Sequence, residues 1–241
     1  MQDDLPSLAT LLADYAALLA AGVPSDIPSP LTPSPLSPAK VDQLEADLGL
    51  TLPADYRALA LTYDLGVIAV YFSRFHPTFK RDLLDALRFA FRDPANPDMS
   101  EGYATWSRYA QEYRAWGVIP VGDDFLQREL VLTVRGCAPL ATDARIERHV
   151  IPYREMAAIA RPVGSVWAFQ PSNHAGGFTF VSSTFTQALW SALYLRVRLR
   201  PSPDDDPLMD PDAALATLAT HDPAIVGAPY WRTWARLMAR D

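Results

Sequence analysis

The sequence predicts an α+β fold, and three observations predict it. Apolar residues recur at helical spacing as far as Trp116, then at the alternating spacing of strands from Gly117 to Val181, and again at helical spacing after Ser183. Helices first, then a run of antiparallel strands, then a closing helix is the order typical of α+β proteins, whereas an α/β protein alternates the two kinds of element.

The chain begins with an amphipathic helix predicted over residues 5–21. Its apolar residues recur every three or four positions: Leu8, Leu11, Leu12, Tyr15, Leu18 and Leu19. A Pro/Ser tract follows, from Val23 to Pro38, and closely spaced prolines disfavour helix and remove sheet donors. We therefore expect an extended, irregular connector along the surface, with a polyproline II ligand for another domain as the alternative.

Two further helices are predicted from their end signals. Ser37 is a suitable N-cap, Pro38 suits a first turn, and Gly49 is a good stop. A third helix should begin at Leu52-Pro53 and end at Gly66. Glu45 lies beside the corner between these helices, where it could accept hydrogen bonds from backbone donors.

The middle of the chain should contain a short β-like run at Val67–Phe72 and two helices, Thr78–Phe91 and Ser100–Trp116. Five strands are then predicted, at Val118–Val121, Leu130–Val134, Ile146–Pro152, Ser165–Phe169 and Phe178–Val181. Ser183 or Thr184 should cap the closing helix, which runs through Leu193. Residues 201–241 are predicted to form an acidic loop and two short helices around Leu215 and Trp234.

Three landmarks in this order resemble the SUKH superfamily, which includes yeast cell-wall-synthesis regulators and many bacterial immunity proteins. The first is the helix with its central glutamate and the corner after it: Glu45, Leu48-Gly49, Leu52-Pro53 and Tyr56. The second is a strand entry, Gly117-Val-Ile-Pro-Val-Gly-Asp-Asp124. The third is the strand that leads into the closing helix, Val181-Ser-Ser-Thr-Phe185. Together they extend over Ser37 to Tyr194.

The sequence also departs from the family pattern. Gln127-Arg128-Glu129 stands where the family usually carries Gly-Asp, and the helix pair between Thr78 and Trp116 is longer than expected. The resemblance implies helices packed on a twisted, mostly antiparallel sheet over residues 37–200. Residues 1–22 then form an extra N-terminal helix, 23–36 the connector, and 201–241 a C-terminal helical extension packed on the domain.

Charge and composition indicate which kinds of partner and which location to expect for this protein. The formal charge is −7 with a pI near 5.1, which argues against nucleic acid as the partner and permits a basic protein partner. The alternative is that the charge only keeps the protein soluble. The absence of a long uncharged apolar run, of a secretory signal and of more than one cysteine predicts a cytoplasmic protein without membrane spans.

No motif predicts catalysis. The four histidines form no metal-binding pattern, and Cys137 has no neighbouring histidine to activate it. Gly176-Gly177 lacks the Lys-Ser/Thr of a phosphate loop. We expect no enzyme activity, no metal and no cofactor. An enzyme with a site assembled from distant residues is the alternative.

Carboxylates are the strongest candidates for a binding face. Asp123, Asp124 and Glu129 lie near the second landmark, and Asp204, Asp205 and Asp206 follow Pro203. At loop positions such side chains are free to meet a partner, although adjacent aspartates in loops are usually only solvated. The alternating segment Leu195–Arg200 would place its three arginines on one face as an edge strand, or it continues the preceding helix.

These observations, with the resemblance, predict a protein that binds another protein. In bacteria the family's members are commonly immunity proteins that occlude a toxin, often a basic nuclease. A scaffold or regulatory protein that uses the Pro/Ser tract is the rival reading, and the oligomeric state stays open. The core should contain the apolar residues of the landmarks and their neighbours: Leu44, Leu48, Leu52, Tyr56, Leu59, Ile119, Val131, Phe180, Phe185 and Leu189.

Overall fold

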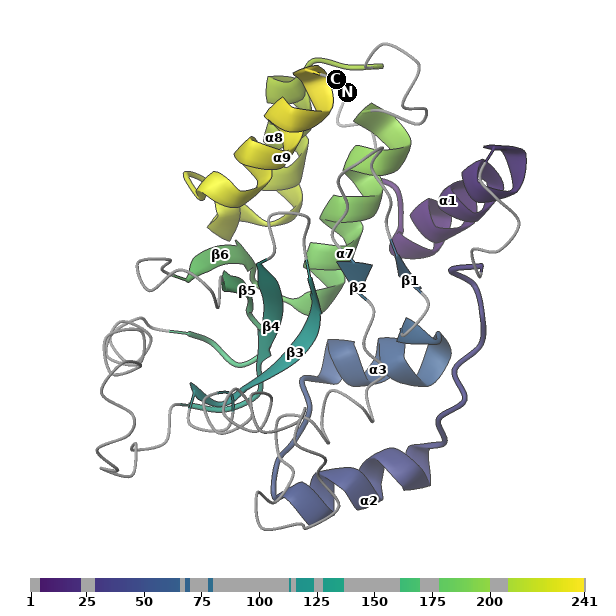
Figure 1. The fold of residues 1–241 in the computed structure, drawn as a ribbon, viewed down its shortest axis with the longest axis vertical. Helices are drawn as coiled ribbons and strands as arrows, with labels where there is room; N and C mark the ends of the chain where they lie inside the picture. Colours follow the sequence, from purple (N-terminus) through teal and green to yellow (C-terminus); the bar gives the residue numbers. More distant parts are fainter. Residues whose placement is uncertain are drawn as a thin grey trace, which may run out of the picture.

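A computed structural model describes residues 5–22, 29–65, 68–69, 78–79, 113, 116–123, 128–136, 161–169, 178–199 and 208–240. In these residues it is an α+β protein with an antiparallel sheet in strand order β1-β2-β3-β4-β5-β6, as Figure 1 shows. Each strand pairs with the next along the chain, so the sheet is a meander. The α+β class predicted from the order of periodicities is confirmed.

Four longer strands form the body of the sheet: β3 (Val118–Asp123), β4 (Glu129–Thr133), β5 (Val166–Phe169) and β6 (Thr179–Ser182). All four predicted strands in these places are confirmed, and the one predicted at 146–152 lies outside the described residues. The short strands β1 (Ile68–Ala69) and β2 (Thr78–Phe79) extend the sheet beyond β3. Every residue of β5 and the last four of β4 are buried, so both faces of the sheet are covered.

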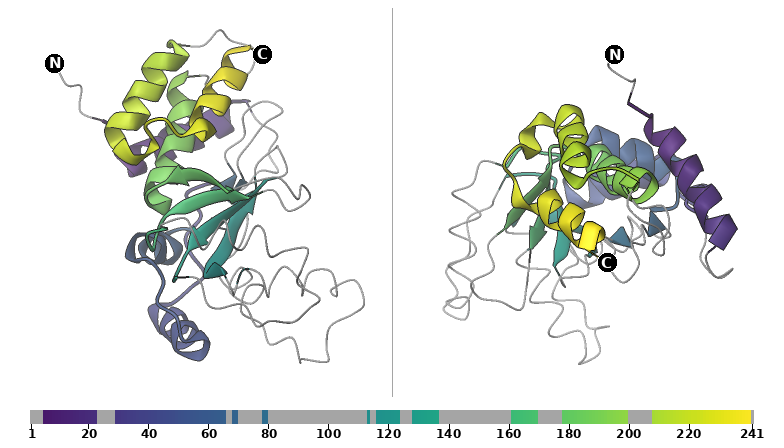
Figure 2. Two further views of the ribbon diagram at one scale, coloured as in Figure 1. Left: turned by 90° about the vertical axis from the view of Figure 1, so that its left-hand side faces the viewer. Right: turned by 90° about the horizontal axis from the view of Figure 1, so that it is seen from above.

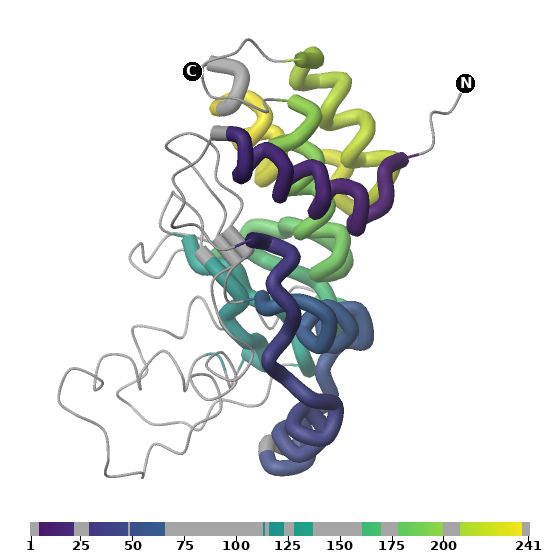
Figure 3. Tube along the Cα trace, turned by 90° about the vertical axis from the view of Figure 1, so that its right-hand side faces the viewer, coloured from purple at the N-terminus to yellow at the C-terminus, as the bar shows by residue number. Residues whose placement is uncertain are grey.

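The helices lie at two ends of the sheet (Figure 2). At one end are α1 (Leu8–Gly22), α8 (Pro211–His221) and α9 (Pro229–Arg240), and at the other is α2 (Pro38–Leu48). Between them, α7 (Phe185–Tyr194) packs against both α1 and α3 (Ala54–Thr62). A short 3-10 turn, η5 (Pro223–Ile225), joins α8 to α9. Eight of the ten residues of α7 are buried, and α1 packs along it (Figure 3). None of the helices in the described part of the chain has the length and apolarity to cross a membrane.

The corner between α2 and α3 forms as the local signals predict. Ser37 caps α2 by accepting the N–H of Lys40, and Gly49 ends the helix with φ 59°, in the left-handed region. The predicted hydrogen bond of Glu45 to the backbone is confirmed, because the N–H of Leu52 donates to its Oε1 at 2.6 Å. Arg57 donates to the same carboxylate at 3.4 Å.

The connector is described from Ser29 onward, where it is irregular and runs along α3. Its backbone is fixed at two points: Ser34 N–H donates to the Thr62 carbonyl, and Asp64 N–H donates to that of Thr32. Pro33 forms an isolated bridge with Tyr63. The prediction of an irregular segment laid along the surface is confirmed for this half, and residues 23–28 lie outside the described part.

Three predicted elements need correction. The third helix ends at Thr62, not at Gly66, since Tyr63 is already extended with φ −122°. Thr78–Phe79 is a strand and not a helix start, because it pairs with Ile68–Ala69 and suits a pleated surface. The segment Leu195–Leu199 is a π-helix, η4, that directly continues α7, so the edge-strand reading is wrong and the helical reading is confirmed.

Most of the predicted core is confirmed as buried: Leu52, Tyr56, Leu59, Ile119, Val131, Phe185 and Leu189. Leu44 and Phe180 are half-buried and pack against this core. The side chain of Leu48 is not among those described, and Leu50, which was not predicted, is buried at the corner. The C-terminal helices predicted around Leu215 and Trp234 are α8 and α9.

Candidate functional site

The acidic candidates of the second landmark lie at one end of the β3–β4 hairpin. Asp123, the last residue of β3, stands directly opposite Glu129, the first residue of β4. Directly opposite residues share a face of the sheet, so the register places two acidic residues next to each other. A bulge between Pro120 and Gly122 sets this register, and it accommodates Pro120, which cannot donate to a ladder.

Glu129 differs from the expectation of a free loop carboxylate. It lies in a strand and is half-buried, and the hydroxyl of Tyr113 donates to its Oε2. Tyr113 itself is 1% exposed. The hydrogen bond from this buried phenol gives the half-buried Glu129 carboxylate a polar partner.

An aromatic cluster lies behind this carboxylate, consisting of Tyr113, Trp116, Phe169 and Phe178. The Trp116 ring meets those of Phe169 and Phe178 edge-on, with centroids 5.1 and 5.2 Å apart. Phe169 is also the strand neighbour of Glu129 in β5. The cluster fixes Tyr113 and therefore fixes the position of the Glu129 carboxylate.

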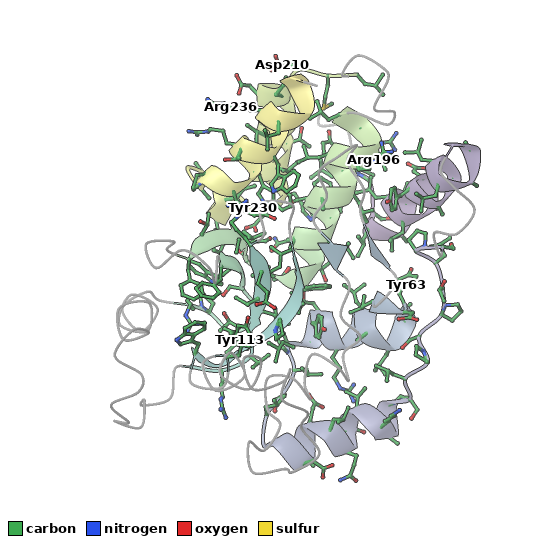
Figure 4. The ribbon with its side chains drawn as sticks, in the orientation of Figure 1. Tyr63, Tyr113, Arg196, Asp210, Tyr230 and Arg236 are labelled. Atoms are coloured by element: carbon green, nitrogen blue, oxygen red, sulfur yellow. The ribbon has the colours of Figure 1, made fainter. Side chains whose placement is uncertain are left out.

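The residue before Glu129 connects the hairpin to the C-terminal extension. The guanidinium of Arg128 lies over the ring of Tyr230, 4.8 Å from its centroid, and Tyr230 is in the first turn of α9. Figure 4 labels Tyr113 and Tyr230, the two tyrosines that hold consecutive residues of the hairpin. Consecutive residues of extended chain point to opposite sides, so the hairpin end is held from both sides.

The remaining acidic candidates are placed only in part. Asp123 is described by its backbone, while Asp124 and the second candidate group, Asp204, Asp205 and Asp206, lie outside the described residues. The structure therefore brings together Asp123 and Glu129. Of the four histidines, only His221 is in the described part, and Cys137 is not. Among the described residues, no three His, Cys, Asp or Glu side chains gather closely enough to hold a metal ion.

A buried carboxylate that the sequence analysis missed connects β6, α7 and α8. Asp222 is 1% exposed, and its oxygens accept from the Ser182 hydroxyl at 2.7 Å and from the N–H and hydroxyl of Ser183, both at 2.8 Å. Ala224 N–H is a fourth donor, at 3.2 Å. The dipeptide Asp222-Pro223 is a signal for such a cap, but the two serine partners are far away in sequence.

This cluster contains serine, aspartate and histidine but is not arranged for nucleophilic catalysis. Both serine hydroxyls donate directly to Asp222, and the ring of the adjacent His221 stacks on Trp190 with centroids 3.9 Å apart. Activation of a serine requires a base that accepts the proton of its hydroxyl and a third group that orients this base. Here the carboxylate is saturated by four donors, which is the arrangement of a structural cap.

A second buried polar group lies between α1 and η4. Arg196 is 6% exposed, and burial lowers its pKa while the neighbouring Tyr15 acts in the opposite direction. Arg198, on the same turn, donates to Asp14 of α1 at 2.7 Å. The two described arginines of the alternating segment therefore lie beside α1 and do not form an exposed strip.

Comparison of the chain with models of known protein families, with curated protein sequences and with solved structures gives no match.

Proposed function

We propose that this protein is a protein-binding domain of the SUKH type that neutralises a basic toxin, such as a nuclease, by occluding it. The observation that carries the proposal is the cross-strand pairing of Asp123 with Glu129 at the end of the β3–β4 hairpin. Asp124 follows Asp123 in the sequence, so three acidic residues fall between positions 123 and 129. A basic partner would be attracted to such an end of a chain that carries a net charge of −7.

The fixed positions of Arg128 and Glu129 in the hairpin support a binding role. Tyr113 and Tyr230 fix residues 129 and 128 from opposite sides, so the end of the hairpin is presented on a rigid base. A preorganised surface loses less conformational entropy when it binds than a mobile loop does. The hydrogen bond from Leu52 to Glu45 gives the glutamate of the first landmark a structural role, so this residue is not part of the proposed binding face.

The test is association with a basic toxin domain encoded beside this gene. Asp123→Asn combined with Asp124→Asn should slow association, and the wild-type rate should fall as salt is added, because complementary charge mainly accelerates encounter. Asp47→Asn combined with Asp212→Asn is the matched control. It removes the same charge from exposed sites on α2 and α8, away from the hairpin.

Two results would contradict the proposal. If co-expression of the neighbouring toxin kills cells with and without this protein, the immunity role fails. If the protein protects but both double variants associate at equal, salt-independent rates, binding uses a surface other than the hairpin.

A further inference from the structure

Trp190 is the side chain at which segments from both ends of the chain meet. It lies in α7 and is 1% exposed. Its indole N–H donates to the carbonyl of Pro6, just before α1, at 2.8 Å. The imidazole of His221, the last residue of α8, stacks on its ring with an interplanar angle of 25°. This stack is therefore one of the contacts that attach α8 to α7.

The backbone around His221 is held as well. Its carbonyl accepts from Nε2 of Gln187, one turn before Trp190 on α7, at 3.1 Å. The next residue, Asp222, is bonded to Ser182 and Ser183 at the junction of β6 and α7. The backbone that carries the imidazole is therefore fixed on both sides of His221 by hydrogen bonds to the start of α7 and the end of β6.

The surroundings of the imidazole accommodate the neutral ring better than the protonated ring. His221 is half-buried, and its Nε2 is buried without a hydrogen-bond partner. In the neutral ring one nitrogen is a bare acceptor, and leaving it unpaired costs less than leaving a charged donor unpaired. In the protonated ring both nitrogens are donors, so a charged N–H would be buried with no acceptor.

Among the described residues, the charged groups on the elements around His221 offer little compensation. η4, which packs against α8, contributes Arg196 and Arg198, and these are cations. No residue of α7 is charged, and the one charged residue of α1, Asp14, pairs with Arg198. On α9, Arg232 and Arg236 are exposed. Asp222 is the nearest carboxylate, but Ser182, Ser183 and Ala224 already donate to it.

Three effects favour the protonated ring, and burial opposes them. One is the position of His221 at the C-terminus of α8, where the helix dipole favours a cation. The indole face attracts a cation, and Asp222 raises the pKa of His221. Burial lowers this pKa by more, so that it lies below the usual range of histidine. The geometry and the direction of the pKa shift therefore agree.

We propose that His221 is an acid-sensitive latch: the neutral ring holds α8 and the helix after it against α7, and protonation loosens them. An opened state, with a solvated imidazole, binds a proton more readily than the closed state. The closed state is thus fully stabilised above the ordinary histidine pKa of about 6.5, and it loses stability as the pH falls from there through the lowered pKa. Each unit of lowering corresponds to a tenfold change in the opening equilibrium.

The test is hydrogen exchange of the full-length chain at pH 7.5 and pH 5.5. Protection of peptides from α8 is divided by that of peptides from β4, which cancels the effect of pH on the intrinsic rate. We expect this ratio to fall at least threefold at pH 5.5 in the wild type. His221→Phe keeps a ring on Trp190 but cannot titrate, so its ratio should stay constant, whereas His149→Gln should behave as wild type.

A ratio that does not change in the wild type, or that changes equally in His221→Phe, would overturn the latch. Should His221→Phe fail to fold, the wild type still decides the matter by proton NMR titration of its imidazole rings. A His221 ring that titrates at or above about 6.5 contradicts the proposal, and one that titrates below it supports the proposal.

Discussion

The Asp222 carboxylate accepts both the backbone N–H and the side-chain hydroxyl of Ser183, each at 2.8 Å. Ser183 lies between β6 and α7, while Asp222 follows α8, so this pair fastens the C-terminal helices to the centre of the fold. The indole N–H of Trp231 adds a second connection by donating to the Val181 carbonyl at 2.8 Å. The extension from residue 208 onward is therefore an integral part of the core.

Asp222→Asn should destabilise the protein markedly. The amide keeps the shape of the carboxylate, but its NH₂ group cannot accept, so at least one buried donor from Ser182, Ser183 or Ala224 loses its partner. A buried unsatisfied donor costs about 1–3 kcal/mol, and more when the lost acceptor was charged. Urea denaturation measures the loss, with Asp212→Asn, an exposed change on α8, as the control. Equal midpoints for the two variants would refute the structural role of Asp222.

Glu45 offers a test that separates a hydrogen bond from a charge. Glu45→Gln retains an oxygen that can accept from the N–H of Leu52, and the ion pair with Arg57 is partly exposed, so little stability should be lost. Glu45→Ala removes the acceptor and should cost about 1–3 kcal/mol in the free energy of unfolding. If both variants lose the same amount, the charge and not the backbone hydrogen bond is what matters.

Gly117 and Gly49 both have positive φ but differ in their surroundings. A Cβ on Gly117 would lie 2.4 Å from the Arg135 carbonyl oxygen, whereas one on Gly49 would meet nothing within 4 Å. Gly49→Ala should therefore show the conformational penalty alone, about 1–2 kcal/mol. Gly117→Ala adds overpacking against backbone, so its loss should be larger by at least about 1 kcal/mol. Thermal unfolding of the two variants compares them directly, and similar losses would show that the chain at Arg135 can move aside.

Helix ends could be predicted from the sequence, because nearby residues determine them. Ser37, Gly49 and Thr184 end or begin helices through hydrogen bonds to residues within a few positions. The sequence identified the first two, and it gave Thr184 as one of two alternatives with Ser183. Burial of α1 followed from its apolar spacing in the same way. The π-helix at Leu195–Leu199 shows the limit, because its alternating pattern fits a strand while its connection to α7 makes it helical.

Contacts between distant residues could not be predicted in this way. Tyr113 and Glu129 are on different elements, and Asp55 accepts the N–H of Thr186 across most of the chain. Nothing in the spacing of either pair indicates that they meet, because the fold brings them together. The acidic residues of the candidate hairpin were therefore identified from the sequence. The hydrogen bond from Tyr113 to Glu129 was not predicted.

The hydrogen bond from Tyr113 to Glu129 leads to a prediction about how much each acidic residue of the hairpin contributes to the association rate. The Glu129 carboxylate is half-buried and accepts from Tyr113, so it contributes less to the field that a partner meets than a solvated carboxylate would. Tyr113→Phe removes the donor but no charge, so it should lower stability by about 1–3 kcal/mol and leave the association rate with a basic partner unchanged. Glu129→Gln should slow association less than the Asp123→Asn and Asp124→Asn double variant does, even per charge removed. Stopped-flow association at low salt, together with denaturation of each variant, measures both quantities. If Glu129→Gln slows association most, Glu129 itself contacts the partner, and the bond to Tyr113 must open on binding.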